Sequence, residues 1–190
     1  MAIPVLPTYT AGEILTSADM NDVSTLGNYQ GLFWIKSQTV GNAVSSVAVT
    51  GAFSSDFDNY LITLNGGTGS ASASIGIILG ASVTGYYGFM SYGDATTSTI
   101  QGAGRNNVAQ LNWIGGHTAG QASSVTVQVI NPFKVAYTKF ANGSYQSGNN
   151  YGTMQGEHRV STSYTGFTLS PDTGTLTGGT IRVYGYRNSL

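Results

Sequence analysis

An alternation of apolar and polar residues with a period of two runs along most of this chain. It constrains the fold more than any other feature of the sequence. The clearest example is Val125–Ile130, a run that Asn131-Pro132 ends. Successive side chains of a strand point to opposite faces, so this run predicts a strand with one buried and one solvated face. Glycine-rich segments separate the runs, which is typical of turns and bulges.

About ten segments after residue 31 share this pattern at the short spacing of sandwiches and barrels rather than of βαβ units. They are Phe33–Ser37, Val47–Val49, Tyr60–Leu64, Ser74–Leu79, Tyr86–Tyr92, Gln110–Ile114, Val125–Ile130, Ala136–Phe140, Thr153–Val160, Tyr164–Leu169 and Thr180–Tyr186. The glycine runs Gly66–Gly69 and Gly102–Arg105 are interpreted as loops. The sequence predicts an all-β fold, with residues 32–190 forming an antiparallel β-sandwich of jelly-roll type.

Residues 1–31 have a different character. Pro4 and Pro7 predict an extended arm over Met1–Tyr9. A short helix is expected near Ser17–Leu26, ending at Gly27, with an apolar stripe on one face. A helix of two or three turns is not stable alone, so it needs a partner surface, either on its own chain or on another protein.

The composition restricts the possible partners. Only 8% of the 190 residues are charged and the net charge is −1, while the chain has 27 glycines, 12 tyrosines and no cysteine. The even charge balance argues against nucleic acid, no segment is apolar enough for membrane insertion, and the N-terminus does not resemble a signal peptide. The weakly charged, tyrosine-rich surface favours a subunit of an assembly, although a small β-rich domain with many turns would also explain it.

Candidate catalytic and metal-binding groups are few. We expect His117 in a loop and His158 on a strand, and we interpret each as an ordinary surface or inter-strand residue, with no metal and no cofactor. Asp56 and Asp58 could bind calcium or act as the two carboxylates of a glycosidase, but a turn capped by aspartate is the simpler interpretation. No nucleophile elbow or phosphate loop is present, so the sequence predicts a protein that is not an enzyme.

Three parts of the chain resemble virion proteins of tailed bacteriophages. The opening segment Tyr9–Asn21, with the sequence YTAGEILTSADMN, is similar to the start of many phage tail, fibre and head-associated proteins. Phe57–Leu64 and Ile130–Phe133 are similar to strands in the β-domains of such proteins, and Gly178–Arg187 is similar to their closing strand.

The resemblance implies a virion structural protein on the particle surface, in tail or capsid, that forms a homo-oligomer, most often a trimer, and contacts other virion proteins. Its N-terminal segment would dock on the particle through Glu13, Ile14, Leu15, Asp19, Met20, Asn21, Val23 and Leu26. Exposed aromatic residues would contact a receptor or a neighbouring subunit, namely Tyr86, Tyr87, Phe89, Tyr92, Tyr145 and Tyr151. The chain would be a short tail fibre or receptor-binding subunit that attaches to a host glycan or protein; the alternative is a capsid or tail decoration protein.

Overall fold

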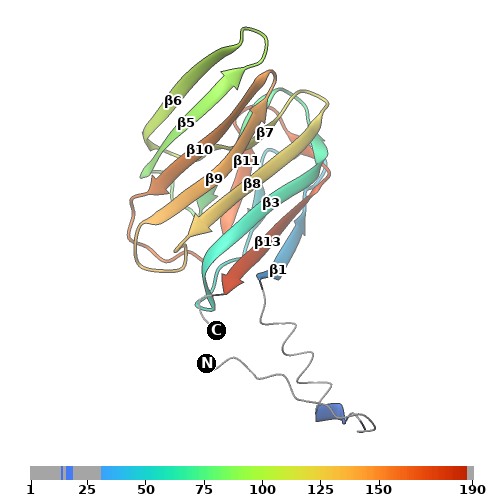
Figure 1. Ribbon diagram of the computed structural model, residues 1–190, viewed down its shortest axis with the longest axis vertical. Coiled ribbons are helices and arrows are strands. Elements are labelled where there is room, and N and C mark those ends of the chain that lie inside the picture. The colour runs from blue at the N-terminus through green and yellow to red at the C-terminus, as the bar shows by residue number, and fades with distance from the viewer. Residues whose placement is uncertain (1–13, 15, 19–30, 188–190) are drawn as a thin grey trace.

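The computed structural model describes residues 14, 16–18 and 31–187, and this part of the chain is almost entirely strand (Figure 1). Only Ser17 and Ala18 are helical within it. The strands are β1 (Leu32–Thr39), β2 (Val47–Val49), β3 (Phe57–Gly69), β4 (Ala73–Leu79), β5 (Tyr86–Asp94), β6 (Thr99–Val108), β7 (Leu111–His117), β8 (Ala122–Ile130), β9 (Thr138–Ser147), β10 (Asn150–His158), β11 (Phe167–Pro171), β12 (Leu176–Thr177) and β13 (Thr180–Arg187). The predicted all-β class is confirmed.

All named strands are joined in one antiparallel sheet that is not closed. A front row has the order β1-β13-β3-β8-β9-β10-β5-β6, and a rear row has the order β2-β11-β4-β7. The rows connect where β7 pairs with β8 over Gly115 and Gly116. Figure 1 shows β7 and β11 behind the front row.

The period of two in the sequence builds the core between these rows. In β8, Val125, Val127 and Val129 are fully buried, whereas Ser124 and Thr126 are exposed. In the rear row β11 has the same alternation, whereas β4 is buried at every position except Ile78, and both strands contribute buried residues from their side of the core. Burial of a Val, Leu or Ile side chain stabilises a fold by about 1.5–3 kcal/mol, so the alternating strands supply the main stabilising term.

Two loop predictions are wrong. The segment Gly102–Arg105 lies inside β6, and β3 continues through the glycines at 66, 67 and 69. The glycine at 102 gives room to the ring of Phe89 on the neighbouring strand, whose Cζ would lie 2.7 Å from a Cβ at this position. Glycine in these two strands therefore permits packing instead of ending the strand.

The predicted helix near Ser17–Leu26 falls mostly outside the described residues, as does the extended arm over Met1–Tyr9. Leu32, the first residue of β1, pairs with Tyr186 near the end of β13. The chain therefore enters and leaves the β-body, which comprises the strands from Leu32 to Arg187, at the same end, the lower end in Figure 1. No helix among the described residues has the length and apolar character needed to cross a membrane.

Both histidines are buried, so of the two settings expected for them, surface or inter-strand, neither occupies a surface position. His117 is the last residue of β7 rather than part of a loop, and His158 ends β10 as a strand residue. Burial lowers the pKa of both imidazoles from the usual value of 6.5, because desolvation disfavours the charged form. Each histidine is therefore neutral in the folded protein near neutral pH.

The two buried histidines predict a loss of stability in mild acid. In the unfolded chain the two imidazoles bind protons below about pH 6.5, whereas in the folded protein they stay neutral to a lower pH. The free energy of unfolding therefore falls as pH decreases from 7 to 5. The slope is at most about 1.4 kcal/mol per pH unit for each histidine. Urea denaturation at several pH values would measure it. In a His117→Gln variant the slope becomes shallower, and a flat profile in the unchanged protein would contradict the prediction.

Candidate functional site

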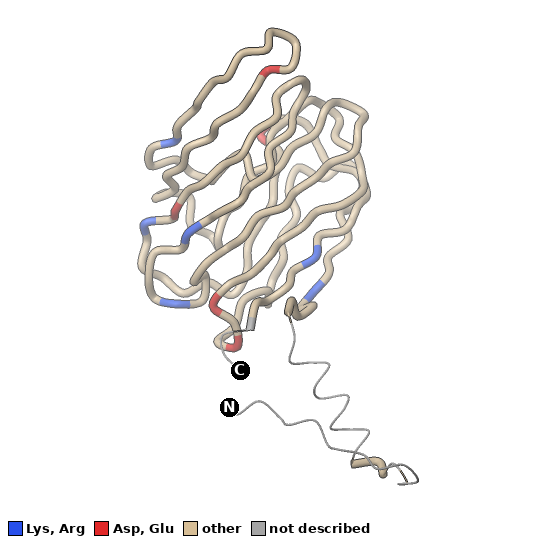
Figure 2. The backbone as a smooth tube through the Cα atoms, in the orientation of Figure 1, with Lys and Arg blue, Asp and Glu red and all other residues tan. Residues whose placement is uncertain are grey.

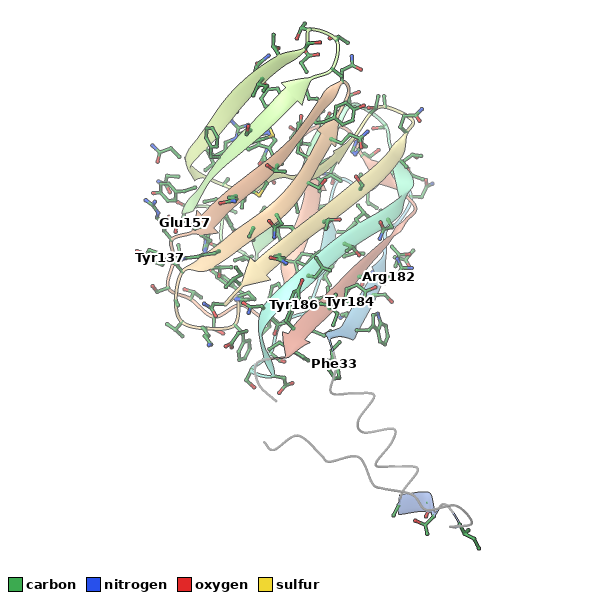
Figure 3. The ribbon with its side chains drawn as sticks, viewed as in Figure 1. Phe33, Tyr137, Glu157, Arg182, Tyr184 and Tyr186 are labelled. Carbon is green, nitrogen blue, oxygen red and sulfur yellow. The ribbon has the colours of Figure 1, made fainter. Side chains whose placement is uncertain are left out.

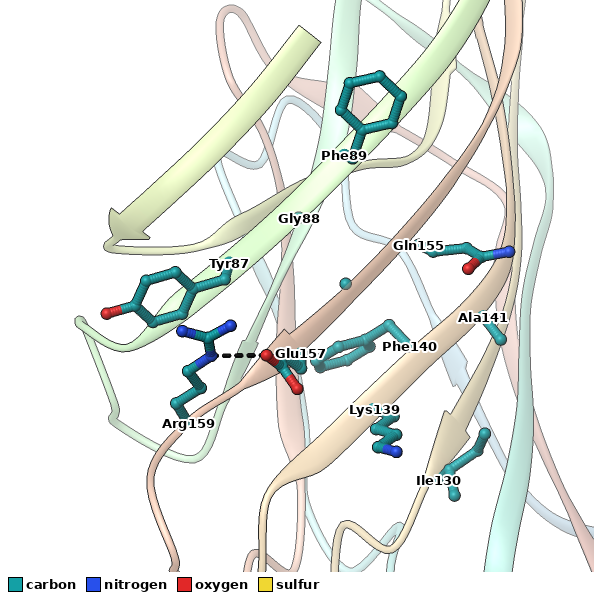
Figure 4. Close-up of a pocket in the computed structure, with 11 residues that line it drawn as sticks. Tyr87, Gly88, Phe89, Ile130, Lys139, Phe140, Ala141, Gln155, Glu157 and Arg159 are labelled. Atoms are coloured by element: carbon teal, nitrogen blue, oxygen red, sulfur yellow. Dashed lines mark hydrogen bonds and ion pairs between the residues drawn. The ribbon is translucent and has the colours of Figure 1, made fainter. Parts of the chain in front are cut away.

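A groove of about 480 Å³ lies on the outer face of the front row, where β5, β10, β9 and β8 run side by side (Figure 4). Aromatic, amide and charged side chains line it, among them Tyr87 and Phe89 from β5, Gln155 and Glu157 from β10, and Lys139 from β9. The side chain of Arg159, which follows β10 directly, closes the lower left of the groove in the view of Figure 4.

Strand register brings these residues together. Glu157 pairs with Tyr87 on one side and with Lys139 on the other, and Gln155 pairs with Phe89. Side chains at paired positions of an antiparallel sheet point to the same face, with Cβ atoms about 5 Å apart. β5 and the β9–β10 hairpin, which are distant from each other in the sequence, thus supply one continuous surface of aromatic, amide and charged groups.

The two aromatic rings have different supports. Phe89 is 59% exposed and lies over the glycine at 102. Tyr87 is half-buried, and the guanidinium carbon of Arg159 lies 4.2 Å from the centre of its ring. A cation in this position is attracted by the ring and limits the orientations of both side chains.

The charges in the groove are arranged around Glu157. Its Oε1 accepts a hydrogen bond from Nε of Arg159 at 2.5 Å, drawn as the dashed line in Figure 4. Hydrogen bonding to this carboxylate raises the pKa of Arg159 further above its usual value. Charged residues are few in this protein, and Figure 2 shows several basic ones along the left-hand edge, the side on which the groove lies. The groove therefore gathers three of the charged residues, Lys139, Glu157 and Arg159.

This chemistry suits binding to hydroxyl-rich ligands. Sugar rings offer apolar C–H faces to aromatic residues and hydroxyl groups that both donate and accept hydrogen bonds. Phe89 supplies an exposed ring, the amide of Gln155 donates and accepts, and Glu157 accepts. Hydrolysis of a glycosidic bond needs two carboxyl groups about 5–10 Å apart, whereas Glu157 is the one acidic residue lining this groove.

Five of the six predicted contact residues fall into three groups. Tyr87 and Phe89 lie in the groove, and Tyr151 is half-exposed at the other end of β10, beside the tip of the β5–β6 hairpin. Tyr92 and Tyr145 are partly buried, with ring centres 6.5 Å apart.

Tyr86 has no exposed surface, which corrects its assignment as a contact residue. Its hydroxyl accepts a hydrogen bond from the backbone N–H of Leu79 at 2.6 Å, and its ring packs against His158. Burial raises the pKa of this tyrosine. Tyr86 therefore belongs to the core and is removed from the contact set.

The predicted docking residues lie almost entirely outside the described residues. Glu13, Leu15, Asp19, Met20, Asn21, Val23 and Leu26 are not described; Ile14 is, and it is 85% exposed. An apolar side chain exposed to this degree is available for contact with another surface.

The two aspartates considered as a carboxylate pair have separate local partners. Asp58 forms an ion pair with Nζ of Lys134 at 2.7 Å, and Asp56 accepts a hydrogen bond from the hydroxyl of Ser54 at 3.0 Å. No group of three or more potential ligands for a metal ion occurs among the described residues. The geometry agrees with a turn stabilised by aspartate rather than a metal or hydrolase site.

One serine–histidine contact needs separate consideration. The hydroxyl of Ser82 lies 2.9 Å from Nε2 of His158, but the carbonyl oxygen of Thr84 lies 3.0 Å from the same nitrogen. A carbonyl oxygen only accepts, so Nε2 carries the proton and is not free to remove one from Ser82. This pair does not meet the requirement for an activated nucleophile.

Comparison with known proteins finds no matching family, no matching curated protein and no matching solved structure. The function must therefore be argued from the residues and their geometry. Sequence reasoning missed Lys139, Gln155, Glu157 and Arg159, although charged residues grouped in a charge-poor chain were an available signal.

Proposed function

We propose that this protein is a non-enzymatic structural subunit of a bacteriophage particle that attaches to a glycan on the host surface through the groove between Tyr87 and Lys139. The observation that supports this best is the combination of an exposed aromatic ring with amide and charged groups on a rigid sheet face. The N-terminal segment, with its resemblance to phage docking segments, would bind the particle, and the β-body, as a jelly-roll sandwich, would present the groove.

The positions of the two functions are compatible. β1, which follows the N-terminal segment, is at one end of the front row, and β5 is six strands away. At about 4.8 Å per strand, this separation is roughly 29 Å. Docking at the β1 side therefore leaves the aromatic end of the groove open.

A second candidate function is decoration of the capsid or tail, and one surface favours it. Trp34 on β1 is 63% exposed and pairs with Tyr184 of β13, and Leu32, at the start of β1, is 43% exposed. Figure 3 labels Tyr184 and Tyr186 on β13. An aromatic patch of this kind is typical of subunit interfaces, and we propose that it joins neighbouring copies, most simply in a trimer.

Substitution at the groove separates these functions. Phe89→Ala should lower adsorption of particles to host cells about tenfold, because a central aromatic contact is lost. The free energy of unfolding should change by less than about 0.5 kcal/mol, since the ring is largely exposed. Adsorption rates and light scattering of the purified protein would be measured together.

Trp34→Ala is the matched variant on the other surface. It should weaken oligomerisation while leaving the groove intact, because Trp34 lies on β1 and not on the strands that line the groove. If Phe89→Ala leaves adsorption unchanged and Trp34→Ala removes the protein from the particle, the decoration function replaces attachment.

A further inference from the structure

The ligand-binding groove contains one cation with no partner among the described residues. This cation is Lys139. It lies directly opposite Glu157 in the pairing of β9 with β10, on the same face of the sheet. An ion pair between them would be the simplest outcome for such neighbours. The carboxylate instead contacts Arg159 at 2.5 Å, and Lys139 is exposed without a hydrogen bond or ion pair.

Arg159 therefore controls the charge that the groove presents. It neutralises Glu157 and is itself held against the Tyr87 ring at 4.2 Å. The remaining unneutralised charge at the groove is the ammonium group of Lys139, which is strongly hydrated and offers three donors. Such a group favours a ligand that carries a carboxylate, a phosphate or a sulfate.

A second hollow extends the groove across the front row. It has a volume of about 280 Å³ and is lined by Asn59, Gln128, Ile130 and Tyr186. Ile130 lines both hollows, so they adjoin. The amide Nε2 of Gln128 donates to the hydroxyl of Tyr186 at 3.1 Å, which fixes the polar edge of the second hollow.

The combined surface crosses β13, β3, β8, β9, β10 and β5, which are five inter-strand steps. At about 4.8 Å per step this is roughly 24 Å, longer than one sugar ring. From the free ammonium group and this length, we infer that the groove binds an extended acidic polysaccharide perpendicular to the strands, with an anionic substituent at Lys139. The inference rests on the proposed attachment function and names its ligand class.

Binding of the full-length protein to an array of bacterial glycans tests the inference. The array carries uronate, sialate and phosphodiester-linked chains, each as single repeats and as longer chains, beside neutral or carboxyl-reduced counterparts. Acidic chains should bind more tightly than their neutral counterparts, and longer chains more tightly than single repeats. Raising the salt concentration should weaken binding of the acidic chains only.

Two pairs of variants locate the effect. Lys139→Met should lower affinity for acidic chains about tenfold or more, as expected for loss of a charge-assisted hydrogen bond. Lys36→Met, on β1, makes the same change in net charge away from both hollows and should have little effect. Asn59→Asp should weaken binding of long acidic chains but not of single repeats, whereas Asn65→Asp, at the other end of β3, should change neither.

Each outcome has one meaning. Equal binding of acidic and neutral chains, or equal effects of Lys139→Met and Lys36→Met, would overturn the acidic ligand while leaving a glycan-binding groove in place. Equal affinity for single repeats and long chains would overturn the extended ligand. Absence of binding to every chain, together with normal host adsorption by Phe89→Ala, would reject the attachment function itself and this inference with it.

Discussion

Replacing Gly116 with alanine is expected to lower the free energy of unfolding by about 3 kcal/mol, at the upper end of the range for overpacked sites. A Cβ at this position would lie 2.2 Å from the carbonyl oxygen of Gln146 and 2.9 Å from that of Ala73. Both contacts are to backbone atoms of neighbouring strands, which cannot rotate away as a flexible side chain can. Urea denaturation followed by circular dichroism would measure the change.

The matched control is Gly104→Ala. Gly104 also lies within a strand, β6, and the nearest atom to a Cβ there is 3.9 Å away, an ordinary contact distance. The expected change is within about 0.5 kcal/mol of zero. If the two variants are equally stable, the close approach of β7 to β9 at Gly116 is not present in solution.

The strands that could be predicted are those with one buried face. Val47–Val49 is found with the predicted boundaries, and Val125–Ile130 forms most of β8, because alternating burial in these strands matches alternating polarity in the sequence. β6 has almost no buried side chain, as it is an edge strand covered in part by Phe89. Its sequence therefore lacks the apolar alternation, and its glycines resemble a loop.

The groove could be predicted only in part. The sequence predicts Tyr87 and Phe89 as contact residues because they are aromatic residues near glycines. The same pattern wrongly adds the adjacent Tyr86. Neighbouring residues of a strand point to opposite faces, so Tyr86 and Tyr87 cannot both be exposed on one side. The residues of β9 and β10 that join Tyr87 and Phe89 in the groove depend on strand register. The register changes at a bulge between Met154 and Gly156, and the sequence does not reveal this change.

The position of Arg159 illustrates the same limit. In the sequence it follows His158 as an isolated basic residue two positions after Glu157. Residues two apart in an extended chain lie on the same face, so the contact of Arg159 with Glu157 follows the period of two. Its position against the ring of Tyr87 depends on the pairing of β10 with β5, a register that no pattern in the sequence encodes.

Under the proposed function, removing Met1–Gly27 is expected to abolish incorporation into the phage particle while leaving the β-body folded. The buried residues of the described core extend from Val40 to Val183, so the deletion removes none of them, and β1 begins later, at Leu32. The free energy of unfolding should therefore stay within about 0.5 kcal/mol of that of the full chain. Incorporation would be measured by immunoblotting of purified particles, and denaturation would be measured on the isolated protein.

The residues responsible are expected to be the apolar stripe of the helix that the sequence predicts near Ser17–Leu26. Met20, Val23 and Leu26 have helical spacing, and each could contribute about 1.5–3 kcal/mol when buried on a partner surface. Replacing these three with serine should reproduce the loss of incorporation, whereas replacing Thr8, Thr10 and Thr16 with serine should not. A truncated protein that still assembles onto particles would show that docking belongs to the β-body, and the exposed patch around Trp34 would then be the first surface to test, because it lies beside the same end of the sheet.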